Sequence, residues 1–476
     1  MDSDWSSGLD LFLPLDRDHR TAGLGHSIEH RLREAIRAGR LARGTALPSS
    51  RSLAGDLGIS RGTVSAAYGQ LAAEGYLAIR QGAAVRVTWT PPTSPSPPSW
   101  PSPPTPSADA PMTEHVDRFR WDFRPGLPSL HAFPRQAWAK AHQAVLAGAP
   151  AESFGYASAL GSAGLRQALA GYLSRARGVD TDPGRLLICG GFTQALLLIC
   201  GALRAEGATT LAVEDPSAPR YRQLAQSLGL AVISVPCDEG GVSVDHLARS
   251  RFDAVLVTPA HQYPLGTTMS AARRTALVQL ARQRHAFIIE DDYDGEFRYD
   301  RQPVGALQQL DPEQVIYTGS ASKTLVPGLR LGWLSAPRSL IGPLVAARQH
   351  LDRGTGILDQ LTLAELINAG AFDRHIRRQR TTYRRRRDLL AQALAPRLQL
   401  AGISAGLHAV VYLSGNEPAG QLRSRAARQS IAVGTLEDYW HDPSARSSPA
   451  LVIGYATPAD HAYRPALDAL TRLLAG

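Results

Sequence analysis

A proline-rich run between residues 91 and 111 divides the chain into two parts that must fold separately. The run reads PPTSPSPPSWPSPPTPSADAP and has ten prolines in 21 positions. Such a run cannot build a core, and it favours extended polyproline II at about 3.1 Å per residue, or roughly 65 Å in all. The sequence therefore predicts a Pro/Ser-rich linker over residues 89–117, between an N-terminal and a C-terminal domain.

The composition outside the linker is that of a globular protein. Of 476 residues, 44% are hydrophobic and 20% are charged, which is ordinary for this class. No apolar run approaches the roughly 18 residues that cross a bilayer, and the N-terminus MDSDWSSGLD lacks a signal-peptide pattern. We therefore expect a cytoplasmic protein with no membrane partner. The cysteines Cys189, Cys200 and Cys237 lack metal-ligand spacing, so we expect buried thiols and no metal.

Residues 20–88, which follow a short tail over 1–19, carry the signals of three short helices and a hairpin. The helical signals are Ile28, Leu32 and Ile36 at a spacing of four, then LPSSRSLAGDLG, then ISRGTVSAAYGQLAAEG. The stretch YLAIRQGAAVRV predicts two strands that turn near Gln81 and Gly82. Together these elements predict a winged helix-turn-helix. Residues 20–90 contain ten arginines and only four acidic residues, which indicates a polyanionic partner.

The third helix is expected to begin after Ser60, and its first turns are the part that enters the major groove of DNA. The stretch LPSSRSLAGDLGISRGTVSAAYGQLAAEGYL resembles the GntR family of DNA-binding domains. The resemblance implies double-stranded operator DNA as a partner, contacted by Arg51, Ser60, Arg61, Thr63, Ser65 and the wing residues Gln81 and Gly82. Taken alone, each arginine would be only a solvated surface charge. The wing reads QGAAV where the family often has a second glycine.

Apolar strand-like runs alternate with helical ones from about residue 118 onward. The runs are TLAVE, AVISV, AVLVT, AFIIE and VIYTG, near residues 210, 231, 254, 287 and 315. This alternation predicts an α/β domain over 118–476, with a mostly parallel sheet, flanking helices and a ligand at the carboxyl ends of the strands.

The chain has only two lysines, Lys140 and Lys323, among 51 basic residues. An ammonium that served only as a charge could be arginine, whereas an amine that must lose its proton and bond to carbon could not. Asp291 and Tyr293 directly follow the strand AFIIE and lie two residues apart, so they can face one ligand. An acid, a phenol and a lone amine are the groups that pyridoxal 5'-phosphate needs.

The phosphate of this cofactor favours a helix N-terminus and an arginine. Gly191, Phe192 and Thr193 open a helix after the strand LLIC. The stretch SASKTLVPGLR places Ser320, Ser322 and Arg330 around Lys323. The sequence therefore predicts a pyridoxal phosphate site that contains all of these residues.

The chain from RWDFRPGLPSLHAFPRQAW to the C-terminus resembles fold-type I aminotransferases. With the GntR-like domain and the linker in front, the whole chain resembles the MocR-type transcriptional regulators. The resemblance implies a head-to-tail, domain-swapped homodimer that binds DNA through both winged helices, and a small-molecule effector that enters the cofactor pocket. By analogy with the aminotransferase dimer, Tyr156 would reach the phosphate across the interface. A core tyrosine is an equally good interpretation.

Three positions depart from the aminotransferase pattern. Tyr263, in HQYPLGT, stands where an asparagine usually meets the cofactor oxygen, and Ala218 stands where a tyrosine usually stacks on the ring. Val452, in ALVIGYA, replaces the arginine that grips a substrate carboxylate, while Arg220 aligns with a second carboxylate-binding arginine. An effector such as pyridoxal phosphate itself, in control of vitamin B6 supply, fits the missing arginine. The alternative effector is an amino acid or amine, which Arg220 could hold.

A run over residues 374–387 has eight arginines in fourteen positions. Arginine is a good helix former, so a solvated helix face is the expectation and a second nucleic-acid surface is the alternative. For the whole chain, the main hypothesis is a pyridoxal phosphate-dependent transcriptional regulator. The competing one is a working aminotransferase tethered by its N-terminal module, and a protein that only recruits partners on DNA is a third. The complete winged helix favours the first, while the full cofactor set leaves a half-reaction open.

Overall fold

The computed structural model describes residues 24–89, 119–299, 304–395, 398, 400–413, 417–442 and 449–475. The chain divides into two compact units, Met1–Glu114 and His115–Gly476. The predicted tail and the proline-rich run lie outside the described residues.

The N-terminal unit is a winged helix-turn-helix, as predicted. Its helices are α1 (Leu24–Arg37), α2 (Ser50–Leu57) and α3 (Arg61–Ala73), followed by the antiparallel strands β1 (Leu77–Ala78) and β2 (Arg86–Val87). Apolar side chains of all three helices meet in one core, among them Ile28, Leu53 and Val64. Gly82 has a φ of 79° in the turn between the strands, a backbone conformation that suits glycine. The helices and the hairpin are therefore held by one core.

An eight-stranded sheet organises the second unit, in the order β4-β11-β10-β9-β8-β5-β6-β7. The strands are β4 (Leu186–Cys189), β5 (Thr210–Asp215), β6 (Ala231–Asp238), β7 (Gly241–Val242), β8 (Ala254–Val257), β9 (Phe287–Asp291), β10 (Val315–Ser320) and β11 (Gly332–Ser335). Strands β6, β5, β8, β9 and β10 run parallel, so the mostly parallel sheet is confirmed. The unpredicted β11 runs antiparallel to both β10 and β4. The short connection before it contains Lys323.

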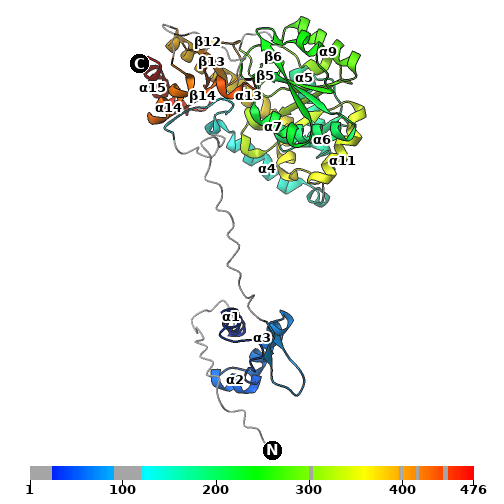
Figure 1. The fold of residues 1–476 in the computed structure, drawn as a ribbon, viewed down its shortest axis with the longest axis vertical. Helices are drawn as coiled ribbons and strands as arrows, with labels where there is room; N and C mark the ends of the chain where they lie inside the picture. Colours follow the sequence, from blue (N-terminus) through cyan, green and yellow to red (C-terminus); the bar gives the residue numbers. More distant parts are fainter. Residues whose placement is uncertain are drawn as a thin grey trace, which may run out of the picture. The chain divides into compact units, whose positions relative to one another are not determined.

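Helices cover both faces of this sheet (Figure 1). They are α4 (Arg135–Gly148), α5 (Ala163–Arg177), α6 (Phe192–Ala205), α7 (Pro219–Ser227), α8 (Val244–Ala248), α9 (Ala271–Arg284), α10 (Ala321–Thr324), α11 (Arg338–Leu351) and α12 (Ile357–Asn368). Neighbouring residues of one strand join different cores: Leu256 packs with residues of α6 and α11, whereas Val257 packs with residues of α9. This alternation buries the sheet on both sides.

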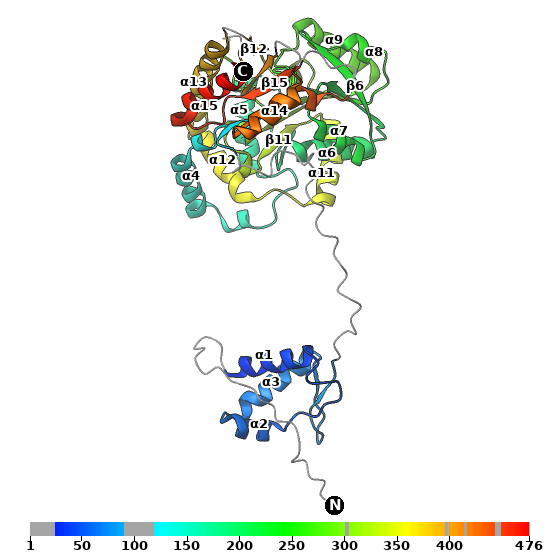
Figure 2. The ribbon, with the colours of Figure 1, turned by 60° about the vertical axis from the view of Figure 1, so that its left-hand side comes forward.

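A second sheet, which the sequence did not predict, lies near the C-terminus in the order β12-β13-β15-β14-β3. Its strands are β3 (Trp121–Phe123), β12 (Leu400–Ala401), β13 (His408–Tyr412), β14 (Ile431–Thr435) and β15 (Ala450–Gly454). Helices α13 (Ala371–Leu394), α14 (Ala419–Arg428) and α15 (Tyr463–Ala475) gather around it (Figure 2). Strand β3 pairs with β14, so the first strand of this unit completes its C-terminal sheet.

Cys189 and Cys200 are buried as predicted, whereas Cys237 is only partly buried. Among the described segments, no helix combines the length and the apolarity that crossing a bilayer requires.

Candidate cofactor and DNA-binding sites

The carboxyl ends of β9 and β10 bring Asp291 and Lys323 into one site. Asp291 is the last residue of β9 and pairs with Thr318 of β10, while Lys323 lies in α10 directly after β10. The half-buried Lys323 donates a hydrogen bond from Nζ to the carbonyl of Gly126, 2.5 Å away. A Cβ at Gly126 would lie 3.9 Å from Nζ, so the backbone comes close to the amine.

Burial shifts both ionisable groups of this pair toward their neutral forms. It lowers the pKa of Lys323 to about 8, with a further contribution from the positive charge of Arg220 and against the pull of Asp291 and Asp294. Burial also raises the pKa of Asp291, against the charges of Lys323 and Arg220. A neutral amine is the nucleophilic form of lysine, and a cationic ring nitrogen would favour the carboxylate form of Asp291.

The first turn of α6 and Arg330 form a cradle for an anion. Gly191 caps this helix with a φ of 91°, and a Cβ there would lie 3.2 Å from the Arg330 guanidinium. The guanidinium donates to the carbonyl of Gly190. Phe192 is half-buried and Thr193 exposed on that turn. Free N–H groups at a helix start beside an arginine suit a phosphate dianion, so the cradle fits the phosphate of pyridoxal phosphate.

Serines complete this end of the site. Ser320 ends β10 and is 9% exposed, and Ser322 is half-buried within α10. Both are immediate neighbours of Lys323 in the segment between the parallel strand β10 and the antiparallel β11. The two serines therefore flank Lys323 at the carboxyl end of β10.

Tyrosines cluster next to Gly126 and Lys323. The hydroxyl of Tyr263 shares a hydrogen bond of 2.9 Å with that of Tyr439, and its ring meets the ring of Tyr293 edge-on at 5.6 Å. A Cβ at Gly126 would lie 3.6 Å from the Tyr263 hydroxyl. Sequence reasoning missed Gly126 and Tyr439, because they come from segments far from Lys323 in the chain and carry no motif of their own.

Of the two positions compared with carboxylate-binding arginines, only position 220 carries one. Arg220 is exposed at the start of α7 and donates to the hydroxyl of Tyr221, 3.1 Å away. Val452 is fully buried in β15 and packs with Val410. Tyr221 also packs against Phe192 with ring centroids 4.8 Å apart. An aromatic ring therefore lies beside the anion cradle, three residues after Ala218.

Tyr156 is not a core residue, so that interpretation is wrong. It is 93% exposed, and the guanidinium of Arg353 lies 5.9 Å from its ring centroid. Its reach toward a partner subunit stays a prediction.

The predicted DNA-contacting residues lie at the starts of α2 and α3 and at the tip of the wing. Ser60 caps α3: its hydroxyl accepts from the Thr63 N–H at 3.1 Å and bonds the Thr63 hydroxyl at 2.8 Å. The half-buried Thr63 is therefore tied to the cap. Arg51, Ser60, Arg61, Ser65, Gln81 and Gly82 are exposed. The opposite side of α3 is buried through Val64, Ala67, Tyr68 and Leu71, which leaves the exposed side available for a groove.

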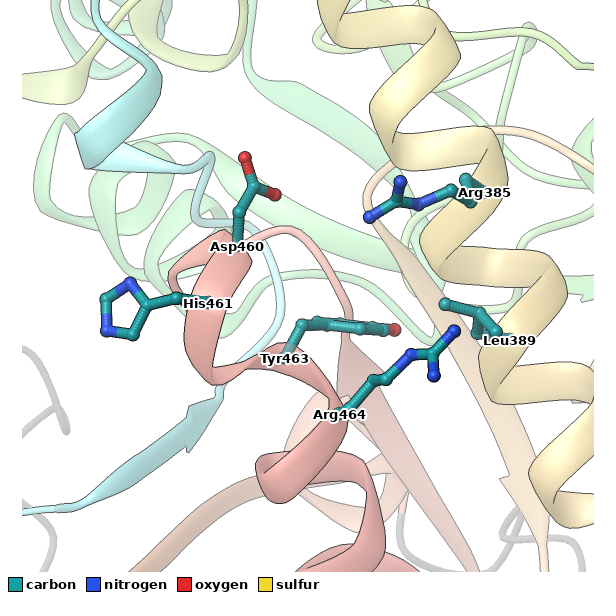
Figure 3. Close-up of a pocket in the computed structure, with 6 residues that line it drawn as sticks. All are labelled: Arg385, Leu389, Asp460, His461, Tyr463 and Arg464. Atoms are coloured by element: carbon teal, nitrogen blue, oxygen red, sulfur yellow. The ribbon is translucent and has the colours of Figure 1, made fainter.

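The arginine-rich run lies on α13. Arg374, Arg377, Arg378, Arg380, Arg384 and Arg385 are exposed, which fits the expected solvated face. Arg386 is instead buried and donates to the carbonyls of Tyr455 and Ala456. A surface pocket of about 220 Å³ between α13 and the start of α15 is lined by Arg385, Leu389, Asp460, His461, Tyr463 and Arg464 (Figure 3). No predicted site residue lines this pocket.

Both units match known families. Residues 24–87 match the bacterial regulatory proteins of the gntR family, and residues 127–436 match aminotransferase class I and II. The chain is 32% identical to the HTH-type pyridoxine biosynthesis transcriptional regulator PdxR of Corynebacterium glutamicum, over 92% of this chain and 93% of PdxR. It is 31% identical to the probable rhizopine catabolism regulatory protein MocR of Rhizobium meliloti, over 93% of this chain and 92% of MocR.

Solved structures agree with the second match. The α-aminoadipate aminotransferase LysN of Thermus thermophilus, solved with N-(5'-phosphopyridoxyl)-L-leucine, is 26% identical with a TM-score of 0.68, over 77% of this chain and 94% of LysN. An archaeal alanine:glyoxylate aminotransferase at 24% identity has the same fold, with a TM-score of 0.68 over 76% of this chain and 92% of the enzyme. The chain therefore belongs to the MocR-type transcriptional regulators of the gntR family, DNA-binding proteins whose aminotransferase-like domain binds pyridoxal phosphate.

Proposed function

We propose that this regulator senses pyridoxal phosphate itself, through Lys323, and controls vitamin B6 supply. The observation that carries the proposal is the buried Val452, which puts an apolar side chain where an amino-acid carboxylate would need a cation. Holding a carboxylate firmly takes a bidentate arginine, and one lost contact of that kind weakens binding strongly. The similarity to a regulator named for pyridoxine biosynthesis supports the same effector class.

Each residue of the site has a proposed role. Lys323 would bond to the cofactor, Asp291 would hold its ring nitrogen, and Tyr263 and Tyr293 would meet its phenolic oxygen. The phosphate would be held by Gly191, Phe192, Thr193, Ser320, Ser322 and Arg330, and the effector would meet Arg220. When bound, pyridoxal phosphate supplies an aldehyde that captures amines. The neutral form of Lys323, favoured by its burial, is the form that reacts with it.

Two further parts of the proposal concern the assembly. The DNA-binding domain spans residues 20–88 and the effector domain 118–476, and two chains form a domain-swapped dimer with two winged helices. A tyrosine that is 93% exposed, such as Tyr156, leaves apolar ring surface in water that a partner subunit would bury. At the DNA, Arg51 and Arg61 meet phosphates and bases, while Gln81 and Gly82 approach the minor groove.

An active aminotransferase is the second candidate function. The observation that favours it is the full set of cofactor groups around a lysine with a lowered pKa. Such a site can exchange amines in a half-reaction without completing a cycle. Regulation would then depend on the amino donor, and not on the cofactor alone.

The deciding experiment measures binding of the full chain to the DNA upstream of its own gene. The protein, stripped of cofactor, is titrated first alone, then with pyridoxal phosphate, then with pyridoxal phosphate plus single amino acids. We expect pyridoxal phosphate alone to change the Kd by about tenfold, a coupling of about 1.4 kcal/mol. A Kd that ignores the cofactor and changes with one amino acid contradicts the proposed effector. Conversion of the cofactor by an amino donor, without specific DNA binding, makes the chain an enzyme.

A further inference from the structure

A buried histidine–aspartate pair is hydrogen-bonded to Tyr293. His261 follows β8 in the loop that also contains Tyr263, and Asp294 follows β9. The His261 Nδ1 lies 2.8 Å from Asp294 Oδ2 and 3.0 Å from the Tyr293 hydroxyl. His261 is 3% exposed and Asp294 2%. No sequence motif had singled out either residue.

The backbone is built closely around this pair. Gly406 has a φ of 75°, and a Cβ at this position would lie 2.3 Å from His261 Cε1 and 2.5 Å from Asp294 Oδ2. Any larger residue there would displace one of the two side chains. The contact between His261 and Asp294 therefore requires a glycine at position 406, in another segment of the chain.

The number of hydrogens that each group carries determines the donor in each of these hydrogen bonds. A carboxylate only accepts, so the hydrogen between Asp294 and His261 belongs to Nδ1. That N–H is then shared with the Tyr293 oxygen, and Tyr293 cannot donate to the same nitrogen. Its own O–H is within hydrogen-bond reach of Asp294, and it would turn from that carboxylate to the phenolic oxygen when the cofactor binds.

We propose that the Asp294–His261 pair is a positioning device that makes Tyr293 a hydrogen-bond donor to the phenolic oxygen of bound pyridoxal phosphate. The proposal rests on the cofactor roles given above to Tyr293 and Lys323. Sharing the Nδ1 hydrogen polarises the tyrosine hydroxyl and strengthens its donation. The carboxylate holds the imidazole in one tautomer, the usual role of such a partner.

A metal site made from the same residues is the competing arrangement. His261, Asp294 and His408 offer ligand atoms within 4.8 Å of one another, and the buried His408 Nδ1 has no hydrogen-bond partner among the described residues. However, two of the three side chains already face each other in a direct hydrogen bond of 2.8 Å. A metal would have to replace that bond and remove the Nδ1 hydrogen, so the geometry favours the hydrogen-bonded pair.

The surroundings of the pair restrict what can titrate near the cofactor. The charged and titratable groups around Tyr293 and Lys323 are Arg220, His261, Tyr263, Asp291, Asp294, His408 and Tyr439. Burial, followed by the nearby His261, lowers the pKa of His408 to about 3. His408 therefore stays neutral above pH 5 and adds no step to a titration between pH 5 and 9.

The expected effect is a shift in the pKa of the visible chromophore that pyridoxal phosphate forms with Lys323. A donor at the phenolic oxygen favours the form that has lost the proton shared with the lysine nitrogen, so it lowers this pKa. Loss of the His261 donor should raise it by about one unit. The effect of Asp294→Asn should be similar, because an amide can donate to Nδ1 and turn that nitrogen into the acceptor of the Tyr293 hydroxyl.

The test is a pH titration of visible absorbance on the full chain loaded with pyridoxal phosphate, with metal analysis of the same samples. We compare the native protein with His261→Ala, Asp294→Asn and His261→Asn, whose amide keeps a donor near the place of Nδ1. His142→Asn is the control, since His142 is a half-buried histidine of α4 whose ring bonds the Thr362 hydroxyl of α12 at 3.0 Å. We expect a raised pKa in His261→Ala and Asp294→Asn, and native values in His261→Asn and His142→Asn.

Two results would overturn the positioning role of the Asp294–His261 pair and leave the proposed function untouched. One is an unshifted pKa in His261→Ala or, if that variant does not fold, in Asp294→Asn. The other is one equivalent of tightly bound metal in the native protein that His261→Ala lacks. A different result would also overturn the proposed cofactor role of Lys323. In that case, the native spectrum would contain no band that disappears in Lys323→Ala. The failure of the positioning pair and the failure of the proposed function are thus separate observations.

Discussion

The guanidinium of Arg330 donates a hydrogen bond to the carbonyl of Gly190, 140 residues away in the chain and directly before the first turn of α6. This contact brings the charge of Arg330 to the helix N-terminus, where the first N–H groups of a helix have no partner within it. One segment supplies backbone donors and the other supplies the cation. Neither segment alone would hold a phosphate dianion firmly.

Arg330→Ala should weaken pyridoxal phosphate binding by about 10- to 100-fold, because a charge-assisted hydrogen bond contributes about 1.5–3 kcal/mol. The measurement is the Kd of the cofactor by absorbance titration. Arg338→Ala is the matched control, since Arg338 is an exposed arginine paired with Asp182 at 2.7 Å. Equal affinities in the two variants would remove Arg330 from the phosphate site.

Gly191→Ala should damage the same cradle from the other side. The new Cβ would lie 3.2 Å from the guanidinium, on a backbone with a φ of 91°. Gly207→Ala is the control for backbone strain alone. Gly207 has a φ of 94°, and its new Cβ would have nothing within 4 Å to crowd. Both variants should lose about 1–3 kcal/mol of unfolding free energy, because residues with a Cβ rarely adopt such a positive φ. Only Gly191→Ala should also lose cofactor affinity, and an unchanged affinity there would contradict the cradle.

The rate at which the cofactor-free protein captures pyridoxal phosphate should rise with pH and level off above about 8. Burial lowers the pKa of Lys323 to about 8, and only the neutral amine reacts. Below that pKa, each unit of pH removes about nine tenths of the neutral form. Arg220→Gln should move the midpoint upward, because the positive charge of Arg220 helps to lower this pKa. Stopped-flow absorbance gives the profile, and a midpoint near the ordinary value for lysine would refute it.

Replacing Arg386 should destabilise the protein far more than replacing its neighbour Arg385 in the same arginine-rich run. Arg386 is 1% exposed and donates to the carbonyls of Tyr455 and Ala456, whereas Arg385 is exposed. Arg386→Ala leaves those carbonyls unpaired and should lower the free energy of unfolding by about 2–4 kcal/mol. Arg385→Ala should change it little. Urea denaturation compares the two, and equal stabilities would show that the buried contacts do not matter.

At the DNA, Arg61→Ala should weaken operator binding and flatten the dependence of log Kd on log salt by about one phosphate contact. Its stability should stay near that of the native protein, because Arg61 is exposed. The control is Arg31→Ala, an exposed arginine of α1 beside Glu34. If both variants bind the operator equally well, Arg61 is not a DNA contact.

Local signals in the sequence were sufficient for the winged helix and for the parallel strands. Ser60 before a helical run predicts a cap, and its hydroxyl does accept from the Thr63 N–H. Hydrophobic runs separated by helices predicted the order of β5, β6, β8, β9 and β10 along the chain. These features depend on residues close together in sequence, where spacing and capping chemistry can be read directly.

Other parts of the site depend on distant segments, and no local pattern announces them. Gly126 reaches Lys323 from a segment 197 residues away, and Tyr439 reaches Tyr263 from 176 residues away. The small sheet was missed because its strands come from both ends of the domain and include the three residues Trp121–Phe123. The buried partner of Tyr293, His261, belongs to the same HQYP turn as Tyr263, but only the structure brings it to Asp294.

The most direct test of the central claim compares the native chain with Lys323→Ala in binding to the intergenic DNA upstream of its own gene. Affinity and footprint are measured with and without pyridoxal phosphate. We predict specific binding by both proteins, and a cofactor-dependent change in affinity or footprint only when Lys323 is present. A cofactor response that persists in Lys323→Ala, or specific binding that ignores the cofactor in the native chain, would show that Lys323 does not couple the cofactor to DNA binding.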